Sequence, residues 1–445
     1  MTDPFRRPPT VGAPPPSLPL KWHAVALLTP YRDGEIFAAE IDYDWTVQSM
    51  RVRMVGLEGT TSDILYVGEQ FFILAPGGAT ATRKFGPFPS LTPVPAPDWL
   101  ASRAVTHVGA GKIMGVDCDW WVGTTPCTNG YQNPPPKTPA LVYNWFWIRR
   151  DNGLPFRQFL SNASNSYRLP GLGEFSLSIF TEFAAAKSTD LPDLVAAAQL
   201  TTDRLPAPVE AAVRSAMSPA DLRTAVAALY QTQAGSAALR PGDLIKGLEP
   251  APPDAPLPEW PDRLCITGFT FPTSQTPGTP PVLPMRVFYD APAGQMLTRC
   301  SLAPYGFSAM PVEDMILDRA ITHLLRRYPD GSHQCIGTVP VGLPKQHWAK
   351  DGGAKPKAVI RDNPVLGPGL TLHVTTIPSE GDRWFWVWYT PDNTGRLFME
   401  TPQFGDVGLV LTDYDSFDHN PPPFPADAFT VPTDCLAPKP QDKET

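Results

Sequence analysis

The sequence predicts a mainly β protein made of two tandem antiparallel units with a helical connector between them. Three observations support this fold class. Pro and Gly are abundant, with 56 and 34 of 445 residues, whereas charged residues make up only 18%. This composition disfavours a protein of long helices, but short strands joined by turns tolerate it. Apolar and charged side chains alternate at residues 50–54 (Met-Arg-Val-Arg-Met), which is the period of a strand with one packed face.

The third observation is a Trp-rich segment that occurs twice. Residues 145–148 read Trp-Phe-Trp-Ile and residues 384–387 read Trp-Phe-Trp-Val, and an Asp-Asn turn follows each segment. Upstream, Ile-Asp-Tyr-Asp at 41–44 corresponds to Val-Phe-Tyr-Asp at 287–290. The pattern predicts that one unit is duplicated in the chain. The alternative is two unrelated β regions that share the composition of strands.

The repeat and the composition divide the chain into five parts. Residues 1–19 form a Pro-rich arm that we expect to be disordered, and residues 20–184 form the first β domain. Residues 185–255 are rich in Ala, with Leu and Val at helical spacing, so they predict a helical connector. This connector is either a plain linker or a lid over the open side of a sheet. Residues 256–436 form the second β domain, and residues 437–445 form a tail.

Charge and hydropathy exclude several partners. The net charge is −8 and basic residues do not cluster beyond pairs, so we expect no binding to nucleic acid or to an anionic membrane surface. No run of apolar residues approaches the length of a membrane span. The N-terminus is polar and Pro-rich and lacks the apolar segment of a secretory signal, which predicts a cytoplasmic protein.

Cysteine spacing and glycine motifs indicate neither a metal nor a cofactor. The 6 cysteines are sparse and lie mostly in strand-like segments, so we expect reduced, buried thiols. C-x-x-C and H-x-x-x-H spacings are absent, which argues against a structural zinc site. Gly109-Ala-Gly111 precedes a strand, so it is not a dinucleotide loop. Asp117 and Asp119 are expected to share one strand face, solvated in most proteins, and an acid/base or metal site is the alternative.

A family resemblance covers the first β domain. It rests on Leu-Pro-Leu-Lys-Trp at 18–22, Ile-Asp-Tyr at 41–43, Leu-Tyr-Val-Gly-Glu at 65–69 and Asn-Gly-Leu-Pro-Phe-Arg at 152–157. In this order and spacing, the first unit resembles the VioE family of violacein-biosynthesis enzymes, whose curved antiparallel sheet is similar to that of the LolA and LolB lipoprotein carriers. The repeat extends the resemblance, more weakly, to the second unit. It implies two tandem VioE/LolA-like half-barrels, each a curved antiparallel sheet that forms a cup.

The resemblance implies an enzyme or a carrier. As an enzyme, the protein would act in specialised (secondary) metabolism without a cofactor. It would catalyse cyclisation or rearrangement of a hydrophobic intermediate, aromatic or not, in the cup. Its partners would be this hydrophobic small-molecule substrate and other enzymes of the pathway. The alternative is a non-catalytic carrier or chaperone of an apolar metabolite or lipid. In both cases we expect a monomer with pseudo-dimeric halves.

The resemblance places a catalytic pair in the first unit. Glu69 corresponds to the carboxylate acid/base, and Arg168 lies near the arginine that contacts the substrate. Desolvation by aromatic walls raises the pKa of a carboxyl group toward neutrality, and an arginine binds a carboxylate through two hydrogen bonds. The alternative is that both side chains lie in solvent. Arg168 has no clear counterpart in the second unit, so we expect an active first unit and a structural second unit, with a shared site as the alternative.

Six further residues are expected to bind the substrate. They are Met54, Tyr66, Trp121, Trp145, Trp147 and Arg149. Aromatic side chains provide rigid area for stacking and a polar group that orients the guest. The alternative is that the Trp side chains simply build the core. Ala26 and Leu28 stand where the resembling family has Tyr and Ser, and Met54 stands where it has Asn, so we expect a more apolar pocket and a less polar substrate.

Overall fold

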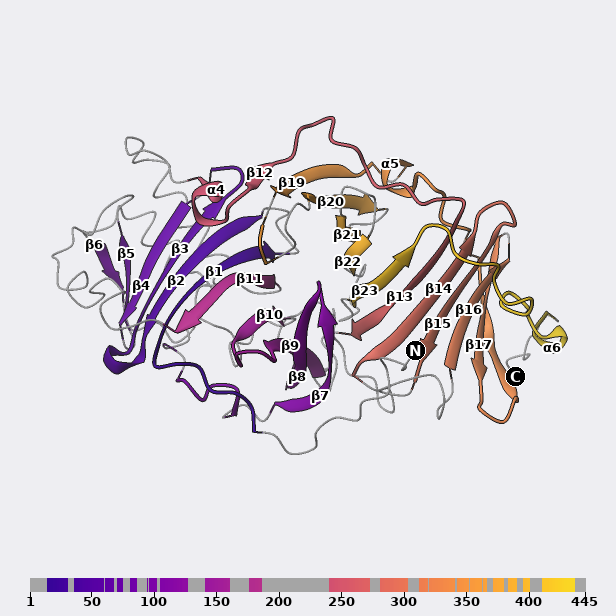
Figure 1. The fold of residues 1–445 in the computed structure, drawn as a ribbon, viewed down its shortest axis with the longest axis horizontal. Helices are drawn as coiled ribbons and strands as arrows, with labels where there is room; N and C mark the ends of the chain where they lie inside the picture. Colours follow the sequence, from indigo (N-terminus) through magenta and orange to yellow (C-terminus); the bar gives the residue numbers. More distant parts are fainter. Residues whose placement is uncertain are drawn as a thin grey trace, which may run out of the picture.

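The structure is a computed structural model that contains two large β-sheets (Figure 1). It describes residues 14–30, 36–59, 61–67, 70–74, 81–85, 94, 96–101, 105–126, 141–160, 176–185, 240–272, 281–302, 312–318, 320–340, 342–351, 353–361, 363–365, 371–379, 383–389, 395–400 and 410–436. In these parts of the chain, the helices are too short or too polar to cross a membrane.

The first sheet has 11 strands among the described residues, and all neighbours are antiparallel. The strands are β1 (Lys21–Pro30), β2 (Phe37–Asp44), β3 (Ser49–Gly56), β4 (Thr61–Val67), β5 (Gln70–Leu74), β6 (Ala81–Phe85), β7 (Thr106–Ile113), β8 (Val116–Pro126), β9 (Leu141–Arg149), β10 (Pro155–Leu160) and β11 (Ser176–Ala185). Their order in space is β6-β5-β4-β3-β2-β1-β11-β10-β9-β8-β7. The first and last strands of the unit therefore pair in the middle of the sheet.

The second sheet has 12 strands in the described part of the chain. They are β12 (Leu248–Pro250), β13 (Arg263–Pro272), β14 (Leu283–Asp290), β15 (Gln295–Ser301), β16 (Val312–Asp318), β17 (Ile321–Arg327), β18 (His333–Val339), β19 (Lys355–Arg361), β20 (Thr371–Ser379), β21 (Arg383–Tyr389), β22 (Gly395–Glu400) and β23 (Val410–Asp418). Short helices are η1 (Trp45–Val47), α4 (Pro241–Leu244), α5 (Trp348–Asp351) and α6 (Thr433–Leu436). The mainly β fold class predicted from the sequence is confirmed.

Both sheets have the same strand order, as expected for a duplicated unit. Without β12, the second sheet runs from β19 through β23 and β13 to β18, just as the first runs from β7 through β11 and β1 to β6. The first strand of each unit also has a bulge against the last strand, at Val25/Ala26 and at Thr267/Gly268. The two Trp-rich segments lie on the equivalent strands β9 and β21. The sequence repeat is therefore also a repeat of the fold.

The predicted connector is described only in part. Residues 186–239 lie outside the described residues, so the choice between linker and lid stays a prediction. Next in the chain, α4 contacts β2 of the first sheet, and β12 pairs with β19 at one edge of the second sheet. A strand of the second sheet thus lies within the range 185–255 that the sequence assigned to the connector.

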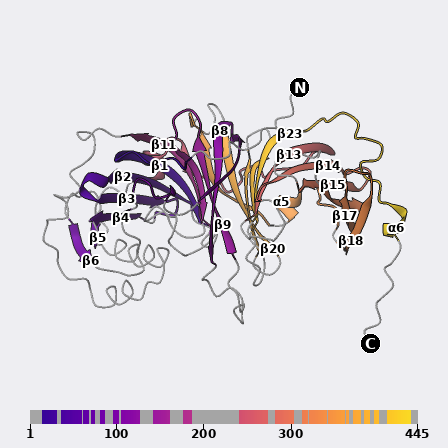
Figure 2. The same cartoon turned by 90° about the horizontal axis from the view of Figure 1, so that it is seen from below.

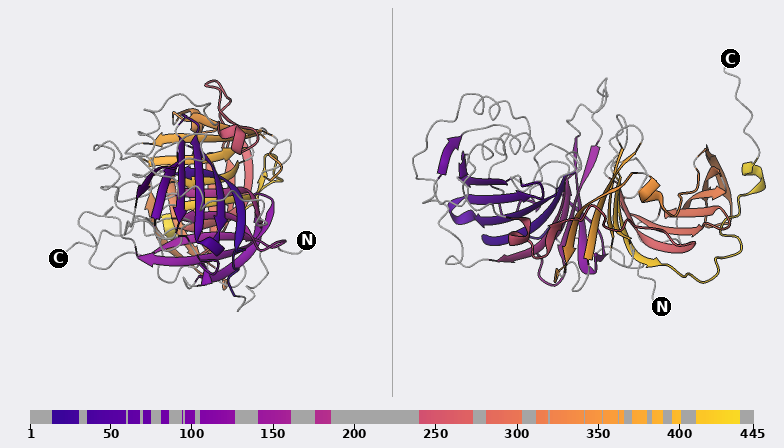
Figure 3. Two further views of the ribbon diagram at one scale, coloured as in Figure 1. Left: turned by 90° about the vertical axis from the view of Figure 1, so that its left-hand side faces the viewer. Right: turned by 90° about the horizontal axis from the view of Figure 1, so that it is seen from above.

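Each sheet bends into a cup, and the two cups lie side by side with the outer sides of their adjoining walls in contact (Figures 2 and 3). We call the concave side of a sheet its cup face and the convex side its back. Trp145 and Trp147 point to the back of the first sheet, whereas Phe146 and Ile148 point to its cup face. This division follows from the alternation of side chains along β9, as the sequence predicted.

The contact between the two backs is an aromatic cluster centred on Phe271 of β13. The Phe271 ring centroid lies 5.1 Å from that of Trp145 and 5.1 Å from that of Trp147, with the rings edge-on. The Trp120 ring lies 5.5 Å from Phe271. Arg157 is completely buried beside them, and its guanidinium carbon lies 3.8 Å from the Trp147 ring centroid. The two halves therefore share one core instead of meeting through a polar interface.

One pair of cysteines is oxidised. Cys335 of β18 and Cys435 of α6 form a disulfide between positions 100 residues apart. The prediction of reduced cysteines is therefore wrong for this pair, which the fold brings together from distant segments. Cys118, Cys265 and Cys300 are free thiols. Burial raises the pKa of Cys118 to about 12, so this thiol is unreactive at neutral pH.

We expect Phe271→Ala to destabilise both halves together, because it removes the ring that fills the space between the two backs. Large-to-small substitutions of buried aromatic residues cost about 3–5 kcal/mol. Urea unfolding followed by tryptophan fluorescence measures the loss. Ile321→Ala is the control, since Ile321 is 47% exposed and its truncation should change the free energy of unfolding little. Equal effects of the two substitutions would contradict a shared core.

We expect His23, on the back of the first sheet, to stabilise the fold more at low pH than at high pH. The His23 Nδ1 atom lies 2.9 Å from Asp42 Oδ1, and this hydrogen bond raises the pKa of His23 above its ordinary value. A raised pKa in the folded state stabilises the fold fully below the unfolded pKa, and the gain is lost as pH rises through the folded pKa.

His23→Gln should therefore lower the free energy of unfolding more at about pH 5 than at about pH 9. His419→Gln, on an exposed turn, is the control and should show no such trend. A cost of His23→Gln that stays constant or grows with pH would contradict the assigned pair.

Candidate functional site

The cup face of the first sheet is a continuous, buried, mostly apolar surface. It comprises Trp22, Ala24, Ala26, Leu28, Phe37, Ala39, Ile41, Tyr43, Met50, Val52, Met54, Ile64, Tyr66, Trp121, Phe146, Ile148 and Phe180. Alternate residues of each strand supply these side chains, because successive side chains of a strand point to opposite faces. Leu18, Val94, Trp99 and Leu100 pack against the same surface from outside the sheet.

Small side chains form the floor of this cup. Ala26 on β1 faces Ala39 on β2, and Ala24 lies two residues away on β1. All three are completely buried. At the positions equivalent to Ala26 and Ala39, the second sheet has Gly268 and Met285. Because alanine side chains are short, the floor of the first cup lies below the large aromatic residues at its two ends.

An aromatic row borders the floor at one end. Tyr66, Met50, Tyr43 and Trp22 are cross-strand neighbours on β4, β3, β2 and β1. The Trp22 ring stacks on Tyr43 at 4.8 Å and on Phe183 at 4.7 Å. Burial raises the pKa of Tyr43, so its phenol is neutral. Trp22 is completely buried, and its indole nitrogen has no hydrogen-bond partner among the described residues.

A second row crosses the other end of the cup and contains polar side chains. This polar row consists of His107, Trp121, Phe146 and Gln158, which are cross-strand neighbours on β7, β8, β9 and β10. Trp121 is 4% exposed and Gln158 only 2%. In the part of the chain that the structure describes, His107 Nδ1, Trp121 Nε1 and Gln158 Nε2 are buried without a hydrogen-bond partner. Trp99 packs edge-on against Phe146 at 5.1 Å and covers the row.

The three unpartnered polar atoms of this row define its chemistry. A buried polar atom without a partner costs about 1–3 kcal/mol, and most buried polar atoms in native proteins are paired. The Trp121 indole and the Gln158 amide nitrogen only donate hydrogen bonds, whereas the imidazole nitrogen of His107 donates or accepts according to its tautomer. Trp121 and Gln158 lie two strands apart, about 10 Å. A guest with a carbonyl, ester or carboxylate oxygen at this end of the cup would accept a hydrogen bond from either donor.

His107 also has a carboxylate partner. Its Nε2 atom lies 3.3 Å from Asp119 Oδ1, and Arg150 Nε lies 3.6 Å from the same oxygen. The imidazole ring packs edge-on against Trp121 at 5.0 Å. A carboxylate orients a histidine and fixes its tautomer, which leaves the second nitrogen to exchange a proton with a guest. One histidine and one aspartate are too few ligands for a structural zinc ion.

The structure separates the predicted substrate-binding residues onto two faces. Met54, Tyr66 and Trp121 lie on the cup face. Trp145 and Trp147 lie on the back, completely buried in the contact with the second sheet. They occupy the alternate positions of β9, so they cannot line one pocket together with the first three residues.

The remaining predicted residues do not join this surface. Arg149 lies at the end of β9 on the same side as Trp147, and its Nη2 lies 2.6 Å from Asp151 Oδ2. Glu69 and Arg168, the predicted catalytic pair, lie outside the described residues. Their roles therefore stay a prediction.

Sequence reasoning missed His107 and Gln158. His107 carries no nearby nucleophile motif, and Gln158 lies inside the strand-like run Pro-Phe-Arg-Gln-Phe-Leu at 155–160. The available signal was a polar residue at a position where the alternation of β10 predicts a buried side chain. The strand register that aligns Gln158 with Phe146 and Trp121 comes only from the structure.

Comparison with known proteins gives a likeness of fold alone. No protein-family model matches the chain, and no curated protein matches it. MucB in complex with MucA, from Pseudomonas aeruginosa, is 15% identical and matches over 70% of this chain and 85% of that chain, with a TM-score of 0.23. The Mycobacterium tuberculosis lipoprotein LppX is 13% identical and matches over 40% of this chain and 90% of that chain, with a TM-score of 0.21.

A LolA-superfamily protein from Nitrosomonas europaea is also similar. It is 13% identical and matches over 40% of this chain and 90% of that chain, with a TM-score of 0.19. The resemblance to LolA carriers noted in the sequence thus has a counterpart among solved structures. The resemblance to VioE is not shown by these comparisons.

The predicted cytoplasmic localisation is corrected by the disulfide. The chain itself contains the Cys335–Cys435 disulfide, and disulfides persist in oxidising compartments and are rare in the cytosol. The polar N-terminus on which the prediction rested is therefore a poor guide to the compartment.

We expect Gln158→Leu to raise the stability of the ligand-free protein by about 1 kcal/mol or more, because it replaces an unpartnered buried amide by an apolar group of similar size. Thermal and urea unfolding measure the change. Gln346→Leu is the matched control and should be neutral or destabilising, since the Gln346 amide donates to Asp262 Oδ1 at 2.7 Å. A loss of stability in Gln158→Leu would show that the amide has a structural partner.

Proposed function

We propose that the protein carries an apolar molecule with a hydrogen-bond acceptor, such as a lipid or an apolar metabolite, on the cup face of its first half. The observation that carries this proposal is the polar row. Its His107, Trp121 and Gln158 hold polar atoms that have no hydrogen-bond partner among the described residues, on an otherwise apolar, buried surface. Apolar walls favour the body of such a guest, and a few converging polar groups fix its orientation.

The proposal assigns the guest to the first half because the second half differs along the equivalent row. By strand register, Trp121 corresponds to Ile377 and Gln158 corresponds to Glu400. An isoleucine has no hydrogen-bond donor, and a carboxylate repels the anionic head of a fatty acid. The proposal therefore agrees with the expectation of one functional and one structural unit.

A second candidate is the cofactor-free enzyme that the VioE resemblance implies, acting on a hydrophobic intermediate by cyclisation or rearrangement. The observation in its favour is the pair of His107 and Asp119, which has the arrangement of an oriented acid/base group beside the aromatic Trp121. Glu69 and Arg168 stay part of this second candidate. A carrier returns its guest unchanged, whereas an enzyme converts it.

The test uses two fluorescent probes, a long-chain fatty acid and a hydrocarbon of similar length without an acceptor. We expect Gln158→Leu and Trp121→Phe each to weaken binding of the fatty acid about tenfold, the loss of one hydrogen bond of about 1.4 kcal/mol. Binding of the hydrocarbon should change much less, because a hydrocarbon has no acceptor for the hydrogen bond that each substitution removes. Fluorescence titration measures both affinities.

Gln295→Leu is the control for surface changes, because Gln295 lies on β15 of the second sheet. Equal affinity of the wild type and Gln158→Leu for both probes would contradict the proposed orientation of the guest. Failure of the wild-type protein to bind either probe would sink the carrier proposal as a whole. Mass spectrometry of the bound molecule before and after incubation separates the carrier from the enzyme.

A further inference from the structure

The C-terminal segment crosses the back of the second sheet after β23 (Figure 1). We call residues 421–436 the C-terminal strap. Phe424 of the strap stacks on Phe288 of β14 at 5.0 Å. Ala428 and Cys435 pack in one cluster with apolar residues of β15, β16 and β17. Arg327 Nη2 donates a hydrogen bond of 2.8 Å to the Thr430 carbonyl. The strap is therefore held to the sheet by both apolar and polar contacts.

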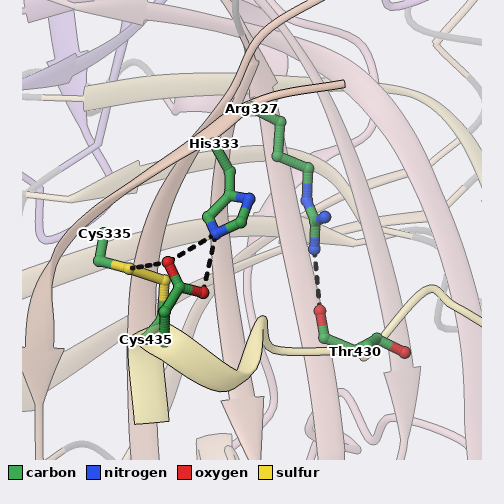
Figure 4. The surroundings of a disulfide bond; sticks show 6 residues. Arg327, His333, Cys335, Thr430 and Cys435 are labelled. Atoms are coloured by element: carbon green, nitrogen blue, oxygen red, sulfur yellow. Dashed lines mark hydrogen bonds and ion pairs between the residues drawn. A yellow bond between two sulfur atoms is a disulfide. The ribbon is translucent and has the colours of Figure 1, made fainter. Parts of the chain in front are cut away.

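Four potential metal ligands meet where the end of the strap reaches β18 (Figure 4). His333 and Cys335 lie two residues apart on β18, and Asp434 and Cys435 are adjacent in α6. His333 Nε2 lies 2.9 Å and 3.0 Å from the two carboxylate oxygens of Asp434. Asp434 Oδ2 lies 3.9 Å from Cys335 Sγ. One ligand atom of each residue lies within 4.8 Å of the ligand atoms of the other three.

We infer that this group is a redox-gated metal site: when the disulfide is reduced, Cys335, Cys435, His333 and Asp434 bind one zinc-type divalent cation. Two thiolates, an imidazole and a carboxylate are the ligand types of a closed tetrahedral zinc site. Residue spacing in the sequence does not predict this site, because the ligands come from two segments that are 100 residues apart. The inference is independent of the proposed carrier function, which concerns the first half.

The chemistry requires an external two-electron reductant, such as a dithiol. A dithiol gives two electrons and two protons to the Cys335–Cys435 bond and becomes a disulfide itself, so two thiols form in the protein. The cation then displaces both thiol protons to solvent and is held by two thiolates. In the reverse step, an external disulfide takes two electrons from the two thiolates and two protons from solvent and becomes a dithiol, while the Cys335–Cys435 bond forms again. The cation is then released to solvent, because the sulfur atoms of a disulfide no longer carry the charge that binds it.

The change in geometry from one state to the other is small. In a tetrahedral site with zinc–sulfur distances of about 2.3 Å, the two sulfur atoms lie about 3.8 Å apart. Cys335 and Cys435 have Cα atoms 5.4 Å apart, so side-chain rotation is enough to open this distance. His333 and Asp434 exchange their mutual hydrogen bond for the metal. Either the disulfide or the metal then joins the strap to β18, and the strap stays on the sheet in both redox states.

The test uses the full chain in two forms, oxidised and reduced with a phosphine that is then removed without oxygen. Co²⁺ is the probe, because tetrahedral thiolate coordination gives it intense visible bands and a thiolate charge-transfer band. We expect the reduced chain to bind one equivalent with these bands, and Zn²⁺ to displace it. The oxidised chain should show neither band. A reduced chain without the charge-transfer band would overturn the inference.

Variants identify the ligands. His333→Gln should weaken Co²⁺ binding at least tenfold, and Cys335→Ser should weaken the charge-transfer band, because only the Cys435 thiolate remains. His419→Gln and Cys265→Ser are matched controls from the same half, outside the cluster, and should bind as the wild type does. Bands that keep their full intensity in Cys335→Ser but disappear in Cys265→Ser would place the metal elsewhere and refute the site. Thermal unfolding gives a second readout, since Zn²⁺ should raise the melting temperature of the reduced chain but not of the oxidised chain.

Discussion

The packing of the two sheet backs around Phe271 is the contact on which the rest of the structure depends. A bent sheet has two faces to bury, and an isolated half would expose the tryptophans of its back. Trp145, Trp147 and Trp120 of the first unit instead surround one phenylalanine of the second. Gly111 supports the arrangement, because a side-chain carbon there would lie 2.6 Å from the Trp120 ring. Because the aromatic part of each back is buried in this contact, the concave face of each half remains available for a separate role.

The two copies have diverged where their surroundings differ. On the back of the first sheet, Arg51 binds Asp63 with two hydrogen bonds of 2.8 and 2.6 Å, and Asp42 binds His23. By strand register, Phe288 and Leu297 of the second sheet replace Asp42 and Arg51. These two apolar residues contact the C-terminal strap. The position that is charged on the back of the first sheet is therefore apolar on the back of the second sheet, where the strap packs against it.

The sequence predicted the fold better than the site, and particular residues explain why. The repeated Trp-Phe-Trp segment and the alternation at 50–54 depend on local period alone, so they predicted the strands and the two units. The same alternation showed that Trp145 and Phe146 face opposite ways, but not which of them faces the cup. That choice depends on Phe271, more than 100 residues away in the chain. The disulfide and the polar row likewise join distant strands, and a sequence without register does not show such neighbours.

The polar row lowers the folding stability of the ligand-free protein, so the fold alone does not explain its presence. The Gln158 amide nitrogen and the Trp121 indole nitrogen are buried without hydrogen-bond partners in the described part of the chain, which works against folding. Leucine at position 158 would fit the surrounding apolar cup at lower cost. The row therefore contributes nothing to the stability of the ligand-free sheet. In the second copy, where register places Ile377 opposite Phe385, one of these donors is absent although the strand order is the same. A feature that the fold does not need, and that one copy lacks, is best explained by a guest that supplies the missing acceptors.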